Sequence, residues 1–207
     1  MKETVVLVHG IWMIGIELSL LRRRLEACGF HCEQFRYHSL LYTPGQNAAR
    51  LSRFVDGIDA EIVHFVAHSL GGIVVLHLFE RDPEQRPGRV LMMGTPLRGS
   101  ATAGSYHRNP MTRWLLGRSI RHGLLGGIPE WCGAREVGMI AGSRGLGVGS
   151  LIPGALERPN DGTVALYETR VPWLNRHLTV PHGHLGMLLS PDVSESVCRF
   201  LRDGEFD

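Results

Sequence analysis

A serine stands where an apolar β-branched run meets a helical pattern. Residues 61–80 read EIVHFVAHSLGGIVVLHLFE, and Ser69 lies between the run IVHFVAH and a segment of helical periodicity. A serine held in a sharp turn between a strand and a helix lifts its hydroxyl clear of the sheet, provided that the residues two before and two after it are small. Ala67 and Gly71 meet this requirement. The stretch therefore predicts a nucleophilic serine, and the competing interpretation is an ordinary helix N-cap.

The histidines near the end of the chain are the candidates for a general base. A serine hydroxyl is a weak nucleophile at neutral pH, so it needs a base, and an acid must orient that base. The base is expected in the loop after the last strand, where HLTVPHGHLGML contains His182 and His184. His184 is preferred because His-Leu-Gly leads directly into the closing helix. Either histidine could instead be a solvated loop residue, and the sequence leaves the choice open.

The orienting acid is expected between the serine and the base in the chain. Asp161 lies in RPNDGTV, within an Asn-Asp-Gly turn of the kind that places a carboxylate at a loop tip. Taken alone, Asp-Gly is merely a turn, and Glu157 is the close competitor. The chain order Ser69, Asp161, His184 favours Asp161.

Two backbone N–H groups are predicted to stabilise an oxyanion. Leu70 follows the serine at a helix N-terminus, where developing negative charge is favoured. The second donor is expected after the first strand, where LVHGIW places Ile11 directly beyond the His-Gly turn. Trp12 is the less favoured second donor. His9 is interpreted either as a group that supports the site or as a histidine packed at the end of a strand.

The elements that must position these residues alternate between short apolar runs and helical patterns. Strands buried on both faces and separated by helices predict an α/β fold with a central, mostly parallel sheet of about six strands and helices on both faces. Open sheets of this kind place their ligands at the carboxyl ends of the strands. The predicted strands cover residues 4–10, 31–37, 62–68, 89–96, 137–142 and 177–181, and the predicted helices cover residues 15–29, 45–58, 70–80 and 192–203.

Two long segments interrupt this alternation. Residues 97–136 and 143–172 both follow the carboxyl end of a predicted strand, and loops of this length inside a compact domain are usually functional or mobile. Within the first segment, residues 111–127 carry apolar residues at helical spacing. They predict either a helix packed on the sheet or a small cap beside the site. We therefore expect a single domain, residues 1–207, with residues 97–136 as a candidate cap insertion.

Composition and charge limit the compartment and the partners. The formal net charge of +2 is too weak to favour nucleic acid, and no run approaches the length of a transmembrane segment. The four cysteines form no CxxC pair, which favours reduced thiols in a cytoplasmic protein without excluding a disulfide. No signal-peptide pattern opens the sequence. The oligomeric state is left open.

Two weaker motifs are not interpreted as binding sites. The His-Gly-His at residues 182–184 has no carboxylate or thiol at ligand spacing, so no metal site is predicted. The run GSRGLGVGS at residues 142–150 lacks the Gly-Lys-Ser/Thr ending of a phosphate-binding loop and enters no helix. It is interpreted as a glycine-rich loop.

The chain as a whole resembles the small, bacterial-type α/β-hydrolase lipases and esterases. The resemblance covers residues 5–187, nearly the whole chain. It rests on the His-Gly turn after the first strand, the A-H-S-x-G elbow at Ser69, G-T-P-x-x-G-S at residues 94–100, N-D-G-T-V with Asp161, and the terminal H-x-G at His184. One departure is the presence of two histidines where the family often has one.

This resemblance implies an α/β-hydrolase fold and a serine hydrolase that forms an acyl-enzyme on carboxylic esters without a cofactor. The substrate would be a small acyl ester, lipids included. A thioesterase, an amidase or an acyltransferase could use the same triad. A non-catalytic relative that binds a small molecule or a partner in the same cleft is the alternative from a different class.

Overall fold

The computed structural model describes residues 2–145, 156–174 and 176–206. In these residues, six strands form one sheet in the order β2-β1-β3-β4-β5-β6, and every pair of neighbours is parallel. This sheet confirms the predicted α/β class. The strands are β1 (Glu3–Val8), β2 (His31–Phe35), β3 (Ile62–His68), β4 (Val90–Met93), β5 (Val137–Gly142) and β6 (Arg176–Val180).

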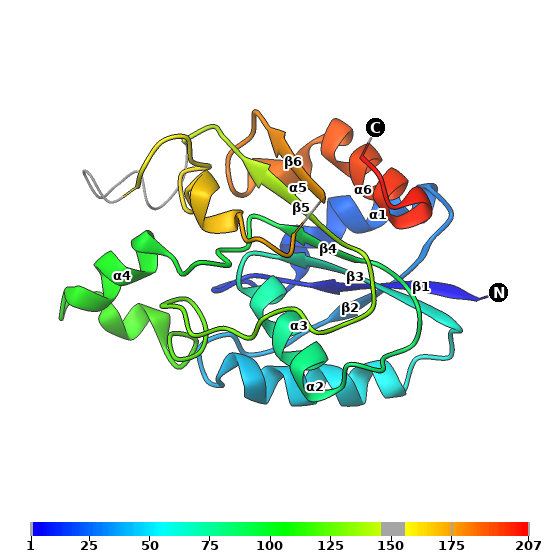
Figure 1. The fold of residues 1–207 in the computed structure, drawn as a ribbon, viewed down its shortest axis with the longest axis horizontal. Coiled ribbons are helices and arrows are strands. Elements are labelled where there is room, and N and C mark those ends of the chain that lie inside the picture. Colours follow the sequence, from blue (N-terminus) through cyan, green and yellow to red (C-terminus); the bar gives the residue numbers. More distant parts are fainter. Residues whose placement is uncertain (1, 146–155, 175, 207) are drawn as a thin grey trace.

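Helices cover both faces of the sheet (Figure 1). On one face α1 (Ser19–Ala27) lies beside α6 (Pro191–Asp203), and on the other α2 (Pro44–Asp56) lies beside α3 (Leu70–Arg81). Shorter helices lie in the connections: η1 (Ile16–Leu18), α4 (Ala101–Arg108), η2 (Arg113–Leu116), η4 (Leu166–Thr169) and α5 (Gly186–Leu189). Both chain termini lie at the end of the molecule opposite α4 (Figure 1).

The central strand β3 is buried on both faces, which explains its continuous apolar run. Its residues Phe65 and Ala67 belong to the core beneath α2 and α3, whereas Val66 belongs to the core beneath α1 and α6. This alternation follows from the two-residue period of a strand. The strand delivers Ser69 to the carboxyl edge of the sheet.

The structure shortens one predicted helix and adds another. Gly15 and Gly29 have φ angles of 98° and 95°, a conformation that favours glycine, and they bracket the predicted helix over residues 15–29. Within this span η1 comes first, and α1 begins only at Ser19. The helix α5 was not predicted, because four residues are too few to display a helical period.

Within residues 97–136, the part that contains α4 and η2 packs on the start of α3, whereas Trp131 packs against Phe79 near the end of that helix. The described part of the segment includes no strand of the sheet. Ala103, Leu116 and Leu124 form a small separate cluster with Leu70 and Ile73 of α3. This part of the segment lies beyond the carboxyl ends of the strands, where Figure 1 shows α4. Its role as a cap remains a prediction.

A disulfide joins Cys28, just after α1, to Cys198 in α6. The prediction of four reduced thiols is wrong for this pair, while Cys32 and Cys132 are free. The two partners are 170 residues apart, so no local spacing in the sequence announces them. Disulfides persist mainly in oxidising environments. The bridge therefore removes the cysteine argument for a cytoplasmic location, which stays a prediction.

None of the described helices is both long enough and apolar enough to cross a membrane.

Removing the disulfide should lower the free energy of unfolding by about 2–5 kcal/mol, because the bridge closes a very long loop in the unfolded chain. The measurement is urea unfolding of the Cys28→Ala/Cys198→Ala double variant beside the oxidised protein. Cys132→Ala, which removes a free thiol, is the control and should shift the midpoint far less. Equal midpoints for the oxidised protein and the double variant would contradict this role.

Candidate active site

Ser69 forms a strained joint between β3 and α3, with φ at 54° and ψ at −121°. Such angles are uncommon for a residue other than glycine. Three hydrogen bonds hold them. The Ser69 N–H donates to the Met93 carbonyl at 2.8 Å, and the Ser69 carbonyl accepts from the Thr95 hydroxyl at 2.9 Å and from the Gly72 N–H at 3.1 Å. The Ser69 side chain makes no capping hydrogen bond to α3. The N-cap interpretation therefore fails, and the backbone matches a nucleophile elbow.

The two glycines after Ser69 allow α3 to approach the sheet closely. A Cβ on Gly71 would overlap the carbonyl oxygen of Val8 and lie 2.7 Å from that of His9. A Cβ on Gly72 would overlap the hydroxyl of Thr95. This close approach brings the start of α3 against the loop after β1.

Asp161 and His184 form a buried pair at the carboxyl edge of the sheet. His184 Nδ1 lies 2.6 Å from Asp161 Oδ2, and the two side chains are 8% and 2% exposed. The other carboxylate oxygen accepts the N–H groups of Thr163 at 2.9 Å and Val164 at 2.7 Å. A carboxylate can only accept a hydrogen bond, so the proton between the two groups belongs to Nδ1 of His184. Nε2 of the neutral ring can then accept a proton from another group.

The alternatives weighed from the sequence do not join this pair. Glu157 is exposed, and its backbone carbonyl accepts a hydrogen bond from the Asn160 side chain. The His182 backbone contacts Val180 and Arg144, and its side chain makes no hydrogen bond in the described part of the chain. The structure thus brings His184 together with Asp161 and leaves Glu157 and His182 outside the pair.

The N–H groups of the two predicted oxyanion donors have no hydrogen-bond acceptor among the described residues. Leu70 is the first residue of α3, where N–H groups have no acceptor within the helix. The Trp12 N–H donates to the Ser39 hydroxyl at 3.2 Å. The Ile11 N–H has no acceptor within the described ranges. Ile11 is therefore better placed than Trp12 to receive negative charge.

His9 packs at the end of β1. Its ring stacks on Tyr37 with centroids 4.2 Å apart, and the Tyr37 hydroxyl donates to the His9 carbonyl at 2.7 Å. Burial lowers the pKa of His9 from its ordinary value. His9 therefore helps to fix the loop that carries Ile11.

His68 is a buried residue beside Ser69, and the sequence predicts no role for it. Its Nε2–H donates to the backbone carbonyl of His184 at 3.0 Å, and the two rings lie 4.5 Å apart. Burial, together with the neighbouring His184, lowers the pKa of His68 well below its ordinary value. A neutral His68 therefore ties the loop of His184 to the elbow. Its position directly before Ser69 was the only signal in the sequence.

Acid should destabilise the fold, because buried histidines resist protonation. Burial lowers the pKa of His68, and that of His177 to about 4, whereas both would titrate near 6.5 in the unfolded chain. Below about pH 6.5 these histidines therefore bind protons in the unfolded chain but remain neutral in the folded chain. The stabilisation is present above that pH and is lost as the pH falls, by up to about 1.4 kcal/mol per pH unit for the fully buried His68 and by less for the partly exposed His177.

Urea midpoints at pH 7, 6 and 5 test this expectation. His177→Gln keeps a hydrogen-bond donor toward Thr169, which His177 contacts at 2.9 Å, and should make the dependence shallower. A midpoint that does not change between pH 7 and pH 5 would be inconsistent with buried neutral histidines.

Ser69 and His184 open onto one cavity of about 480 Å³ with mostly apolar walls. Its lining includes Ile11, Trp12 and the half-exposed Leu185. A second, much smaller cavity of about 30 Å³ adjoins Ser69 on the side of α4. Within the described ranges the Ser69 hydroxyl makes no hydrogen bond, so none joins it directly to His184. Catalytic hydrogen bonds commonly tighten only when substrate binds.

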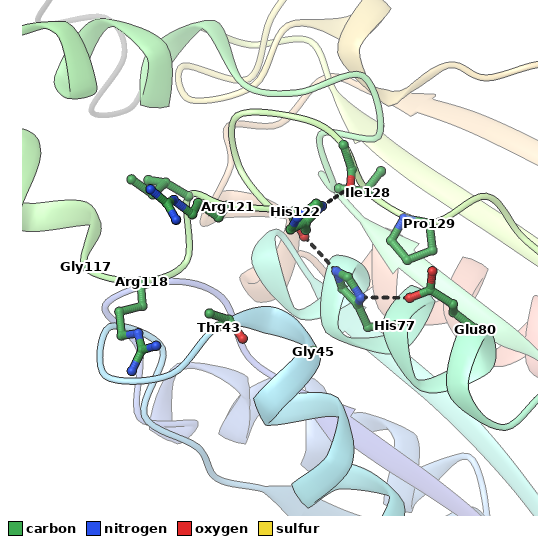
Figure 2. Close-up of a pocket in the computed structure, with 12 residues that line it drawn as sticks. Thr43, Gly45, His77, Glu80, Gly117, Arg118, Arg121, His122, Ile128 and Pro129 are labelled. Carbon is green, nitrogen blue, oxygen red and sulfur yellow. Dashed lines mark hydrogen bonds and ion pairs between the residues drawn. The ribbon is translucent and has the colours of Figure 1, made fainter.

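A larger cavity, about 700 Å³, lies between the start of α2, α3 and residues 117–129 (Figure 2). Figure 2 shows His77 at its centre, where Nε2 lies 2.6 Å from the His122 carbonyl and Nδ1 lies 3.2 Å from Glu80. Both ring nitrogens are thus engaged. Among the described residues, no serine or cysteine lines this cavity, and none lines both this cavity and the Ser69 cavity. Volume alone does not make it the candidate active site.

No three His, Cys, Asp or Glu side chains in the described ranges are close enough together to hold a metal ion. Residues 146–150 of the glycine-rich run lie outside the described residues.

Comparisons with known proteins agree with this fold. The model of a family described as "Alpha/beta hydrolase family" matches residues 5–200. No curated protein sequence matches the chain.

Three solved structures illustrate the likeness in fold. The mature lipase BlEst2 of Bacillus licheniformis is 19% identical, with a TM-score of 0.72 over 90% of this chain and 86% of that one. A metagenomic carboxyl esterase, MGS0156, is 19% identical, with a TM-score of 0.67 over 90% of this chain and 65% of that one. The pyrethroid hydrolase PytH is 10% identical, with a TM-score of 0.69 over 98% of each chain. At these identities the likeness shows the fold alone, and it confirms the fold predicted from the motifs.

Proposed function

Because the chain belongs to the alpha/beta hydrolase family, we propose that it is a serine hydrolase that cleaves carboxylic esters through an acyl-enzyme intermediate. The observation that supports this most is the buried Asp161–His184 pair, which opens onto the same cavity as the strained Ser69. The names of two structural neighbours, a lipase and a carboxyl esterase, also favour an acyl ester as substrate, lipids included.

In the first half of the reaction, Ser69 is acylated. Nε2 of His184 takes the hydroxyl proton as Ser69 Oγ bonds to the ester carbon, and the carbonyl electrons move onto oxygen. The N–H groups of Ile11 and Leu70 hold this oxyanion at the start of α3. When this tetrahedral intermediate collapses, the bond between the acyl carbon and the alcohol oxygen breaks. His184 gives its proton to the departing alcohol. Asp161 keeps the ring oriented and stabilises its charged form.

In the second half, water releases the acid. His184 takes a proton from water as the water oxygen bonds to the acyl carbon, which forms a second oxyanion in the same place. When this second tetrahedral intermediate collapses, the bond between the acyl carbon and Ser69 Oγ breaks, and His184 returns the proton to that oxygen. The products are a carboxylic acid and the regenerated serine.

Thioester hydrolysis, amide hydrolysis and acyl transfer use the same groups and remain alternatives. A non-catalytic binding protein is disfavoured, because binding alone requires neither a strained serine nor a buried carboxylate–histidine pair. The apolar walls of the Ser69 cavity suit esters better than charged thioester carriers or peptides.

A matched set of acetyl substrates tests the proposal. The kcat/KM for p-nitrophenyl acetate should exceed that for p-nitroacetanilide by several orders of magnitude, with Ser69→Ala as the blank. An acetyl thioester should be hydrolysed more slowly than the ester. Turnover of the anilide at the rate of the ester would favour an amidase, and no turnover of any acyl substrate would favour a binding protein.

A further inference from the structure

We infer that this enzyme is selective for esters that join a very short acyl group to a large apolar alcohol. The inference rests on the proposed function and adds the orientation of the ester in the site. It is carried by two cavities of very different size, about 480 Å³ and about 30 Å³, which meet at Ser69.

The two cavities share the residues at which the reaction would take place. Ser69 and the oxyanion donor Ile11 line both, so the ester carbon lies at their junction. The two substituents of that carbon, the acyl group and the alcohol, must then extend in different directions, one into each cavity.

The position of His184 determines which cavity holds the alcohol and which holds the acyl group. It lines the large cavity and not the small one. The departing alcohol oxygen takes its proton from His184, so the alcohol must lie on the side of His184, in the large cavity. The same cavity then admits the water that attacks the acyl-enzyme, because that water also gives its proton to His184.

The acyl group is left with the small cavity beneath α4. About 30 Å³ accommodates a group of one or two carbon atoms. Its walls are firm, because Ala103, Leu116 and Leu124 are all buried in the cluster that attaches this segment to α3. The Thr102 hydroxyl also donates to the Thr163 carbonyl at 2.7 Å, which ties α4 to the loop of Asp161. A longer acyl chain would have to displace these contacts.

Two isomeric esters test this orientation with equal hydrophobicity. Octyl acetate and ethyl octanoate have the same formula, but only the former has a short acyl group and a long alcohol. Below their solubility limits, and with each rate divided by that for alkaline hydrolysis of the same ester, kcat/KM should be at least about tenfold higher for octyl acetate.

Equal values, or a preference for ethyl octanoate, would overturn the inference and leave the ester hydrolase proposal intact. If neither ester were hydrolysed and Ser69 did not react with a fluorophosphonate, the proposed function would be wrong and the inference would fall with it.

Two variants locate the selectivity in the small cavity. Leu116→Ala enlarges it and should raise the ratio of kcat/KM for p-nitrophenyl butyrate to that for the acetate by about tenfold. Leu201→Ala removes the same atoms from the core beneath α1 and α6, remote from the cavity, and should leave the ratio unchanged. Ala103→Val narrows the cavity and should lower the ratio. An unchanged ratio in both cavity variants would show that the acyl chain lies elsewhere.

Discussion

Replacing Ser69 with alanine is expected to lower kcat for ester hydrolysis by about six orders of magnitude, because no oxygen remains to form the acyl-enzyme. The fold should be unaffected. The Ser69 side chain makes no capping hydrogen bond, and alanine has the same Cβ in the same strained backbone. The measurements are kcat on p-nitrophenyl acetate and the urea midpoint of the variant.

Ser190 is a matched control, since it also precedes a helix. Its hydroxyl accepts the Val193 N–H at the start of α6, as an ordinary N-cap does. Ser190→Ala should therefore cost about 1 kcal/mol of stability and leave kcat unchanged, the opposite of Ser69→Ala. A Ser69→Ala protein that keeps its activity but loses stability would return Ser69 to the role of a cap.

Replacing His184 with alanine is expected to lower kcat by about four to six orders of magnitude, because the Ser69 proton then has no acceptor. His182→Ala should lower it about tenfold or less. The reason is the geometry of the pair, since Asp161 Oδ2 lies 2.6 Å from His184 Nδ1, and no hydrogen bond or ion pair joins Asp161 to the His182 ring among the described residues. Both variants are measured side by side on one ester.

The reverse ranking of the two histidines would mean that His182, and not His184, is the general base. It would leave the assignment of Ser69 untouched. Asp161→Asn should also lower kcat, by about four orders of magnitude, because the amide no longer holds the ring with its proton on Nδ1.

The strained turn at Ser69 could be predicted from the sequence because its requirements are local. Small residues must flank a serine between a strand and a helix, and Gly71 meets backbone atoms of β1 in the structure, as the turn demands. The parallel sheet could be predicted for a similar reason. A strand buried on both faces has a continuous apolar run, and β3 is such a strand.

Features that depend on contacts between distant parts of the chain were harder to predict from the sequence. The disulfide joins helices that only the folded sheet brings together, and its residues carry no local pattern. The choice of His184 over His182 rested on a preference in the sequence and on the contact with Asp161 in the structure. The hydrogen bond from His68 to the His184 carbonyl likewise joins residues 116 apart in sequence.

The size of the small cavity beside Ser69 could not be predicted at all. It depends on how residues 97–136 fold back onto the start of α3, and the spacing of their apolar residues was compatible with either a helix on the sheet or a cap. The structure places Leu116 and Leu124 against Leu70, one residue from Ser69. The contact that sets the volume is therefore a tertiary one.

The most direct test of the catalytic assignment is the site at which a fluorophosphonate probe reacts. Attack by an activated serine displaces fluoride and leaves a stable phosphonyl adduct on the nucleophile. Intact mass should show one adduct per chain, peptide mapping should place it on Ser69, and labelling should slow greatly in His184→Ala and vanish in Ser69→Ala. An adduct on another residue, or labelling of Ser69→Ala at the rate of the unmodified protein, would contradict the account.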